Sequence, residues 1–281
     1  MNDSTQKKMN KIGFIGGGNM AESLIGGLLA SGRPAQDLLV SDPDEQRRTH
    51  LAGKYGITVI SDNNELVARS DLVLMAVKPQ VLRDIALSIG QAVQSKHPVI
   101  VSIAAGVRIE DIDRWLGGNL AIVRVMPNTP ALVRAGAAGL FANPRVSEGQ
   151  RNEAESILRA VGITVWLQDE DLMDVVTALS GSGPAFFFRV IEALEKAASQ
   201  AGLPADTSRL LAIETALGAA KLALEADEPV AELRRKVTSP GGTTEAGLEA
   251  LEAGEIDSLF GRATTAAVAR SRELAKQLGA D

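Results

Sequence analysis

Glycines near the start of the sequence have the types and spacing of a phosphate-binding turn. Residues 11–21, KIGFIGGGNMA, form a short apolar run that breaks into glycines and then resumes as a helical pattern. Gly16, Gly18 and Ala21 occupy the three positions of the G-x-G-x-x-G/A fingerprint, where the first glycine allows a tight turn and the second lets backbone approach a pyrophosphate. The first N–H groups of the helix, from Asn19 onward, lack intrahelical partners and would bind that anion.

The surroundings of this turn favour a dinucleotide site over an ordinary glycine turn. An amphipathic helix pattern follows the glycines, and a second apolar run, residues 38–40, ends close to Asp42. This is the layout of one βαβ unit with an acidic residue at the place where such folds bind a ribose hydroxyl.

Two polar, glycine-rich stretches later in the chain could bind a second ligand. They are residues 180–185, SGSGPA, and residues 238–244, TSPGGTT. Successive glycines expose their N–H groups, and the hydroxyls of Ser239, Thr243 and Thr244 add donors suited to an anion such as a carboxylate. The alternative, that both stretches are interhelical turns with serine and threonine caps, stays open for each one taken alone.

Composition excludes several classes of function. The chain has no cysteine, so disulfides, thiolate nucleophiles and cysteine-bound metals are excluded, and with two histidines we expect no metal site. A net charge of −6 argues against nucleic acid or an anionic membrane as partner. We therefore expect a cytoplasmic enzyme with a small-molecule substrate. Hydride transfer fits, because it needs a cofactor, an oriented substrate and few protein groups.

Hydrophobic patterns divide the 281 residues into two parts. Up to residue 168, apolar runs alternate with helical patterns, which predicts an α/β domain with a doubly wound parallel sheet of the Rossmann type. From residue 169 to 281 the strand patterns stop and the sequence predicts an all-α domain. Ligands bind such sheets beyond the carboxyl ends of the strands, where the glycine turn and the loops after the later strands would lie.

The helix pattern at residues 208–226 is nearly all Ala, Leu and Ile. Helices that are apolar on most sides are buried, and a domain of about 110 residues buries only part of its surface. We therefore expect this domain to be covered by a second subunit in a homodimer. A compact monomeric helical domain is the alternative.

Taken together, the motifs resemble the Δ1-pyrroline-5-carboxylate reductase family over almost the whole chain. The most specific match is VTSPGGTTEAGLEALEAG at residues 237–254, which is similar to the family signature. The other matching segments are FIGGGNMA (14–21), AVKP (76–79), SIAAGV (102–107), MPNTPALV (126–133) and LSGSGPA (179–185).

The resemblance implies an activity, a fold and a set of site residues. It implies reduction of 1-pyrroline-5-carboxylate to L-proline with NADP(H), or alternatively NAD(H), by an intertwined homodimer that assembles into a decamer. It assigns Ser239, Gly242, Thr243 and Thr244 to the substrate, with the Thr244 hydroxyl on the ring nitrogen as the catalytic contact. The implied cofactor residues are Gly16, Gly17, Gly18, Asn19, Met20, Asp42, Asn63, Ala76, Val77, Lys78, Pro79, Ala104, Ala105 and Asn128.

Departures from the family pattern leave alternatives open. Asp42 stands where many relatives carry a small hydroxyl residue suited to the 2′-phosphate of NADPH, and Arg47 and Arg48 oppose it by favouring that phosphate. Lys236 and Asp227 stand where some relatives place an asparagine and a glutamate near the ligands, so we assign no ligand-binding role to these two residues. The rival functions are an imine reductase, a β-hydroxyacid dehydrogenase-like enzyme, or a dinucleotide-sensing module without turnover.

Overall fold

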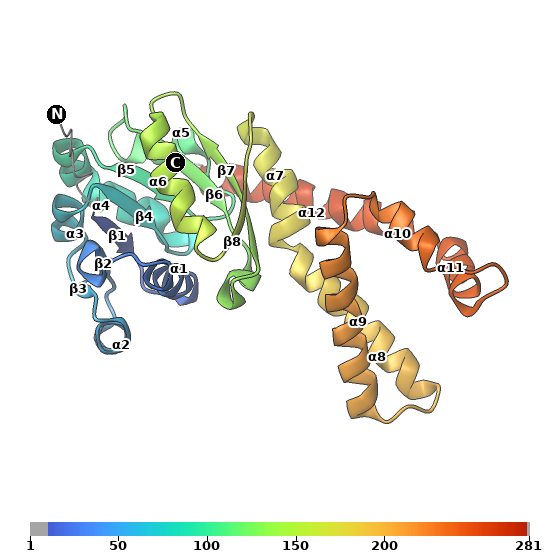
Figure 1. The fold of residues 1–281 in the computed structure, drawn as a ribbon. Helices are drawn as coiled ribbons and strands as arrows, with labels where there is room; N and C mark the ends of the chain where they lie inside the picture. The colour runs from blue at the N-terminus through green and yellow to red at the C-terminus, as the bar shows by residue number, and fades with distance from the viewer. Residues whose placement is uncertain (1–10, 280–281) are drawn as a thin grey trace, which may run out of the picture. The chain divides into compact units, whose positions relative to one another are not determined.

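The computed structural model describes residues 11–279 and divides into two compact units (Figure 1). The first, here called the sheet unit, holds the chain up to Gly181 and again from Ala267 onward, and the second, the helical unit, is Ser182–Ala266. The boundary expected between residues 168 and 169 stays a prediction.

One eight-stranded sheet forms the centre of the sheet unit, with the strand order β3-β2-β1-β4-β5-β6-β7-β8. Strands β1 to β6 pair in parallel, and β8 is parallel to β7. The strands are β1 (Ile12–Ile15), β2 (Leu38–Ser41), β3 (Thr58–Ile60), β4 (Leu72–Met75), β5 (Val99–Ser102), β6 (Ile122–Met126), β7 (Gly136–Ala142) and β8 (Gly162–Trp166).

The predicted doubly wound sheet is confirmed, with one difference at its edge. Strand β7 runs antiparallel to β6. A parallel neighbour requires a crossover connection of a dozen or more residues, but only a short loop with the 3₁₀ turn Thr129–Val133 joins these two strands. The chain therefore turns back on itself here, and β7 reverses direction.

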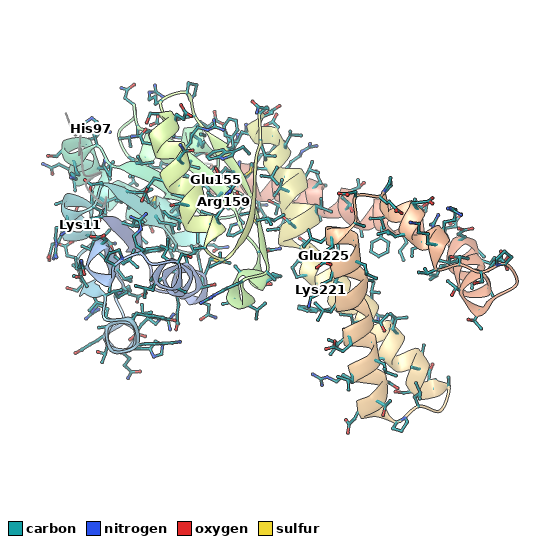
Figure 2. The ribbon with its side chains drawn as sticks, viewed as in Figure 1. Lys11, His97, Glu155, Arg159, Lys221 and Glu225 are labelled. Carbon is teal, nitrogen blue, oxygen red and sulfur yellow. The ribbon has the colours of Figure 1, made fainter. Side chains whose placement is uncertain are left out.

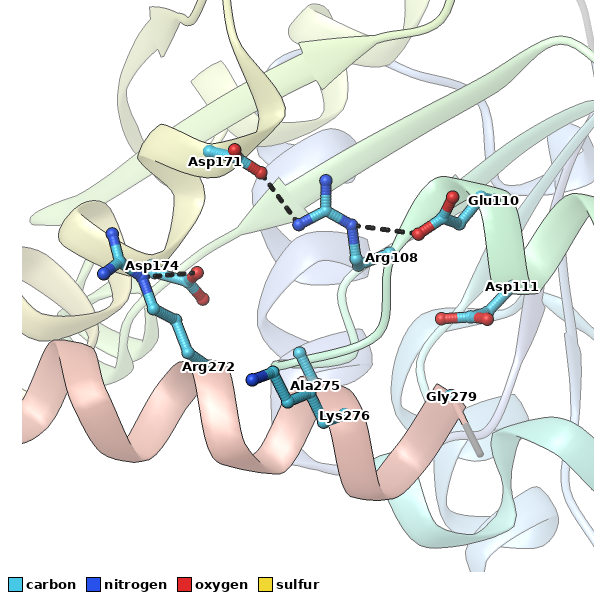
Figure 3. A pocket seen from close by; sticks show the side chains of 9 residues that line it. All are labelled: Arg108, Glu110, Asp111, Asp171, Asp174, Arg272, Ala275, Lys276 and Gly279. Carbon is cyan, nitrogen blue, oxygen red and sulfur yellow. Dashed lines mark ion pairs between the residues drawn. The ribbon is translucent and has the colours of Figure 1, made fainter. Parts of the chain in front are cut away.

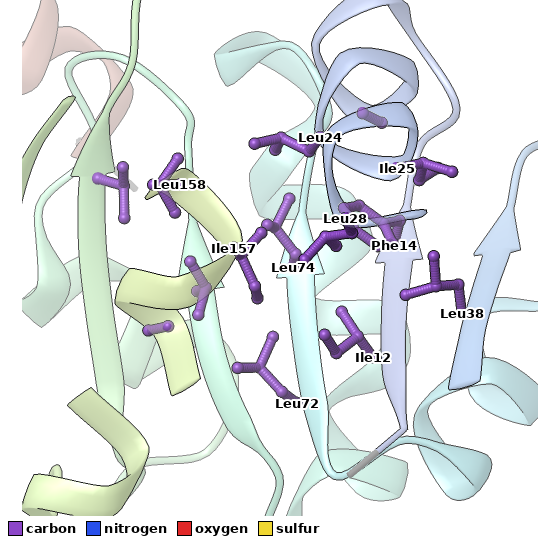
Figure 4. Close-up of a cluster of buried hydrophobic side chains, with 14 of the residues drawn as sticks. Ile12, Phe14, Leu24, Ile25, Leu28, Leu38, Leu72, Leu74, Ile157 and Leu158 are labelled. Atoms are coloured by element: carbon purple, nitrogen blue, oxygen red, sulfur yellow. The ribbon is translucent and has the colours of Figure 1, made fainter. Parts of the chain in front are cut away.

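Helices cover both faces of the sheet and bury two apolar clusters. Side chains of α1 and α6 pack with Ile12, Phe14 and Leu74 on one face (Figure 4), while α3, α4 and α5 cover the other face around Val73 and Ile100. The helices are α1 (Asn19–Ala30), α2 (Glu45–Tyr55), α3 (Asn63–Arg69), α4 (Pro79–Lys96), α5 (Ile109–Trp115), α6 (Glu148–Arg159) and α7 (Met173–Val176). Because the central strands are buried on both faces, their sequences are continuous apolar runs.

Glu155 on α6 fixes the edge strand β8. Its carboxylate accepts hydrogen bonds from Trp166 Nε1 at 3.0 Å, from Thr164 Oγ1 at 2.8 Å, and from Arg159 Nε at 2.8 Å, one turn along the same face (Figure 2). The bond from Trp166 is the largest of the effects that lower the pKa of Glu155, against the opposing effect of burial. The last strand is thus held by charge-assisted bonds from one side.

The helical unit contains α8 (Gly183–Gln200), α9 (Ala205–Glu225), α10 (Val230–Lys236), α11 (Thr243–Ala253) and the first part of α12 (Ile256–Gly279). Helices α8 and α9 pack against each other. Large apolar side chains on α9 nevertheless lie exposed in this chain, among them Leu210, Leu211, Leu217, Leu222 and Leu224. The predicted apolar helix therefore has a surface that the single chain does not cover.

The first segment of the predicted all-α part, from Asp171 to Leu179, is not one continuous helix. A 3₁₀ turn at Glu170–Leu172 leads into α7, and a π-helical turn follows at Thr177–Gly181. The hydroxyl of Thr177 donates to the carbonyl of Met173 at 2.7 Å, and that of Ser180 donates to the carbonyl of Val176 at 3.0 Å. Such bonds from hydroxyl groups to carbonyls four residues earlier compete with the helix ladder and distort it.

Two adjacent glycines of α1 lead to a prediction about stability. A Cβ atom at Gly27 would lie 2.6 Å from Val161 Cγ1 and 2.7 Å from the Ala160 carbonyl oxygen, whereas one at Gly26 would meet Tyr55 at an ordinary 3.5 Å. Gly27→Ala should therefore destabilise the fold by ~1–3 kcal/mol through overpacking. Gly26→Ala, the matched control, should stabilise it by about 0.5–1 kcal/mol through its helix propensity. Denaturant unfolding of both variants measures the difference, and equal effects would contradict the packing.

Candidate active site

The predicted cofactor residues lie at one edge of the sheet, because each follows the carboxyl end of a strand. Gly16–Met20 follow β1, Asp42 follows β2, and Asn63 opens α3 after β3. Ala76–Pro79 follow β4, Ala104 and Ala105 follow β5, and Asn128 follows β6. Parallel strands bring these loops to a common edge, which is where ligands bind in folds of this kind.

Gly16 and Gly18 are glycines for different reasons. Gly16 has a φ of +95°, and a Cβ atom there would lie 2.6 Å from the Ala76 carbonyl oxygen, so the fold itself requires glycine. A Cβ atom at Gly18 would meet nothing within 4 Å. Gly18 precedes α1, whose N-terminus has no side-chain cap. The chain thus leaves open space before a helix N-terminus, which fits the pyrophosphate of a dinucleotide.

Asp42 supports the glycine turn directly. Its Oδ2 atom accepts a hydrogen bond from the Gly17 N–H at 2.8 Å, and its Oδ1 atom accepts one from the Asp44 N–H at 2.9 Å. Sequence reasoning assigned Asp42 to a ribose hydroxyl but missed this bond to the turn. The carboxylate therefore has a structural role whichever cofactor binds.

Two arginines of α2 surround the same turn. Arg47 donates from Nε to the Gly17 carbonyl oxygen, and its Nη2 lies 2.5 Å from Glu22 Oε2. Arg48 Nη1 donates to the carbonyl oxygens of Asp42, at 2.6 Å, and Pro43, at 2.9 Å. Arg48 is thus held beside Asp42, where a 2′-phosphate would need positive charge, and Arg47 is held at the glycine turn.

Glu22 lies in the first turn of α1, where its charge would oppose a bound phosphate. Burial alone would raise its pKa, but hydrogen bonds from Lys54, His50, Arg47 and Tyr55 outweigh burial and lower it from 4.5 to about 2. The bond from Lys54 Nζ is 2.8 Å long. These donors offset the charge of Glu22 and fix α1 against α2.

Asn128 connects two loops of the sheet unit. Its Oδ1 atom accepts a hydrogen bond from the Ala137 N–H at 2.9 Å, and its Nδ2 donates to the Ser180 carbonyl oxygen at 3.0 Å. Both ends of the amide thus bind main chain. The structure places Asn128 as a bridge to the π-helical turn, a link that sequence reasoning missed.

The predicted substrate residues belong to the helical unit. Ser239, Gly242, Thr243 and Thr244 lie in the loop between α10 and α11 and in the first turn of α11. The Thr238 hydroxyl donates a hydrogen bond to the Arg234 carbonyl oxygen at 2.7 Å. Within the described chain, the hydroxyls of Ser239, Thr243 and Thr244 form no hydrogen bond, so they are available as donors and acceptors to a ligand.

A charged pocket of about 570 Å³ in the sheet unit holds none of the predicted residues (Figure 3). Arg108 pairs with Asp171 at 2.8 Å and with Glu110 at 3.3 Å across it. On the α12 side, Ser271 Oγ donates to the buried Asp174 at 2.6 Å. The Ser271 bond, with Arg272 at 3.7 Å from the same carboxylate, fastens α12 to α7. The charged side chains that line the pocket are thus largely paired with one another.

Two further properties concern metals and membranes. Over residues 11–279, no three His, Asp or Glu side chains are arranged to hold a metal ion. None of the helices in that range is long and apolar enough to cross a membrane.

Two protein-family models match the sequence. One is described as pyrroline-5-carboxylate reductase dimerisation and matches residues 170–274. The other is described as NADP oxidoreductase, coenzyme F420-dependent, and matches residues 11–106.

Several individual proteins are similar to this chain over nearly their whole length. A pyrroline-5-carboxylate reductase of Pseudomonas aeruginosa is 48% identical over 269 residues, covering 96% of this chain and 98% of that protein. The solved structure of a pyrroline-5-carboxylate reductase from Coxiella burnetii matches with a TM-score of 0.92 and 44% identity, over 95% of this chain and 99% of that one. The Plasmodium falciparum pyrroline carboxylate reductase, solved with NADP bound, matches with a TM-score of 0.83 and 30% identity, over 95% and 98%.

The Glu22 cluster leads to a prediction about pH. Because the pKa of Glu22 falls from 4.5 to about 2 on folding, its contribution to the free energy of unfolding is present above pH 4.5 and is lost as the pH falls towards 2. Glu22→Gln should cost about 2 kcal/mol of unfolding free energy at pH 7, a figure reduced for solvent screening. The difference in unfolding free energy between the variant and the wild type should narrow as the pH is lowered from 5 to 3. Urea unfolding across this range measures it.

Glu65→Gln is the control for the Glu22 variant. Glu65 pairs with Arg69 at 2.9 Å on the surface, with about half of its side chain exposed. Its loss should change the free energy of unfolding by less than about 0.5 kcal/mol. A Glu22 variant that behaved like this control at every pH would show that the cluster does not stabilise the fold.

Proposed function

The chain belongs to the pyrroline-5-carboxylate reductase family, and on this premise we propose that it reduces 1-pyrroline-5-carboxylate to L-proline with NADPH. The observation that carries the proposal is the presence in one chain of two complementary features. The sheet unit has an open helix N-terminus behind Gly18, and the helical unit has a loop with free hydroxyls at residues 239–244.

We propose that the cofactor lies along the sheet edge, where the residues implied by the family resemblance are located. Gly16 to Met20 would hold the pyrophosphate through the N–H groups of α1. The loops after β4, β5 and β6, with Ala76–Pro79, Ala104–Ala105 and Asn128, would line the nicotinamide half, and Asn63 would support the adenosine side. NADPH is the donor of the hydride. The chain's own contribution is to orient the nicotinamide ring and to keep the phosphate charges paired.

Little acid–base chemistry is required of the protein. The ring nitrogen of the substrate is positive when protonated, so its C=N carbon already accepts a hydride. Ser239, Gly242 and Thr243 would bind the substrate carboxylate, and the Thr244 hydroxyl would accept a hydrogen bond from the protonated ring nitrogen. Positioning of this kind is a sufficient role for uncharged side chains.

The rival functions fit the residues less well. A β-hydroxyacid dehydrogenase uses a lysine shortly after the first helical glycine loop, but α8 carries Arg189 there, exposed and 3.6 Å from Glu192. A general imine reductase would lack the need for a carboxylate-binding loop. A sensing module without turnover would bind NADPH without oxidising it, and an assay of NADPH oxidation with 1-pyrroline-5-carboxylate separates it from the enzyme.

Self-association follows the dimerisation segment, residues 170–274, to which α8, α9, α10 and α11 belong. The apolar side chains exposed on α9 supply a surface for such a contact. We extend this to a decamer built from five such dimers, which size-exclusion chromatography with light scattering would test. A cytoplasmic location is also part of the proposal, since a chain without cysteine needs no oxidising compartment.

Thr244 is the residue whose change tests the substrate loop. Thr244→Ala should remove one hydrogen bond to the substrate and cost ~1–3 kcal/mol of transition-state stabilisation, seen as a fall in kcat/KM for 1-pyrroline-5-carboxylate. Thr244→Ser keeps the hydroxyl and should retain most of the activity. Equal kcat/KM values for the wild type and Thr244→Ala would remove Thr244 from the site.

Asp42 is the residue whose change tests cofactor choice. Its carboxylate should repel a 2′-phosphate, so Asp42→Ser should raise the ratio of kcat/KM for NADPH over NADH by about tenfold. Asp44→Ser is the matched control, because it removes a charge two residues away and keeps the helix cap on Gln46. An unchanged ratio in Asp42→Ser would show that Asp42 does not contact the ribose.

A further inference from the structure

Residues Ser239 to Gly242 form a tight turn before α11. The Gly242 N–H donates to the Ser239 carbonyl oxygen at 3.0 Å, Pro240 occupies the second position, and Gly241 has a φ of +69° at the third. These are the features of a type II turn, in which proline and glycine are the favoured central residues. The turn determines where Thr243 and Thr244 begin the helix.

Glu245 holds this turn from within the helix. Its Oε2 atom accepts a hydrogen bond from the Gly241 N–H at 2.7 Å. In a capping box the third helical residue bonds back to the N-cap residue, whose own side chain caps the helix in return. Here the N-cap residue is Gly242, which has no side chain, and Glu245 bonds one residue farther back.

The main effect of this bond is to order the turn, because the N–H group that it binds is not buried. Gly241 is exposed, so its N–H would bind water if Glu245 were absent. Two successive glycines, however, have the greatest backbone freedom of any dipeptide, and a fixed loop must lose that freedom. The carboxylate supplies part of this ordering before a ligand binds, which is the usual source of affinity in a preorganised site.

The geometry points to Glu245 as a positioning residue of the substrate loop. It holds the turn through Gly241, so that Thr243 faces the substrate carboxylate and the Thr244 hydroxyl faces the ring nitrogen in a fixed arrangement. This inference rests on the proposed function. Glu245 acts through its acceptor oxygen and not through its charge, since a negative charge at this helix end would weaken binding of a carboxylate.

Two substitutions separate the hydrogen bond from the charge. Glu245→Ala removes both, and should raise KM for 1-pyrroline-5-carboxylate about 3- to 10-fold, with kcat and KM for NADPH little changed. Glu245→Gln keeps an acceptor oxygen and removes the charge, so it should keep KM within about twofold of the wild type, or lower it. Rescue by glutamine is the result that a purely electrostatic role would not give.

The control lies on the same helix. Glu249 lies one helical turn after Glu245, is exposed, and makes no hydrogen bond or ion pair to any residue in 11–279. Glu249→Ala should leave every kinetic constant within about twofold. A rise in KM equal to that of Glu245→Ala would show that the effect does not depend on the bond to Gly241, and would overturn the inference.

A second measurement tests the turn without turnover. Amide hydrogen exchange over residues 237–244 of the intact protein should be faster in Glu245→Ala than in the wild type, and should return to the wild-type rate in Glu245→Gln. Unchanged exchange and unchanged KM in the alanine variant would refute the positioning role. If the wild type itself does not oxidise NADPH with 1-pyrroline-5-carboxylate, the proposed function fails, and the exchange rates still decide whether Glu245 holds the turn.

Discussion

The structure depends on the close approach of β1 and β4 at the glycine turn. Gly16 adopts a φ of +95° with its Cα hydrogen directed at the Ala76 carbonyl, at a distance where no side chain fits. This approach lets α1 start at the sheet edge with its N–H groups uncovered. Every other part of the cofactor edge, from Asp42 to Asn128, is placed by strands that pair outward from these two.

Charge around that turn is balanced by residues from other elements. Glu22 carries a negative charge into the first turn of α1, and donors on α2 hold its pKa near 2. Asp42 adds a second carboxylate, whose oxygens are occupied by main-chain N–H groups. Arg47 pairs with Glu22, and Arg48 donates to the Asp42 carbonyl oxygen. A phosphate can therefore approach the helix N-terminus without meeting an unpaired carboxylate, which explains how an acidic first turn is compatible with a dinucleotide site.

The two glycine-rich stretches of the second half differ in how they are fixed. Residues 180–181 form part of a π-helical turn that Asn128 joins to the loop after β6. Residues 239–242 form a type II turn whose bonds are all local, within the helical unit. The first loop thus depends on tertiary contact with the sheet, while the second is specified by its own sequence, with Glu245 four residues after Gly241.

The sequence by itself determined the parallel sheet, the helices and the glycine turn, because buried strands and amphipathic helices have distinct periods and only glycine tolerates a φ of +95°. It also marked the Ser-Pro-Gly-Gly turn, whose residues suit one turn type. Only the tertiary structure decided the reversal of β7, the broken helix before Gly181 and the return of α12 to the sheet unit. It alone showed that Asp42 bonds to the glycine turn, that Asn128 bonds to the π-helical turn, and that Glu22 accepts bonds from α2. These features rest on contacts between residues far apart in the chain, and no local period encodes such contacts.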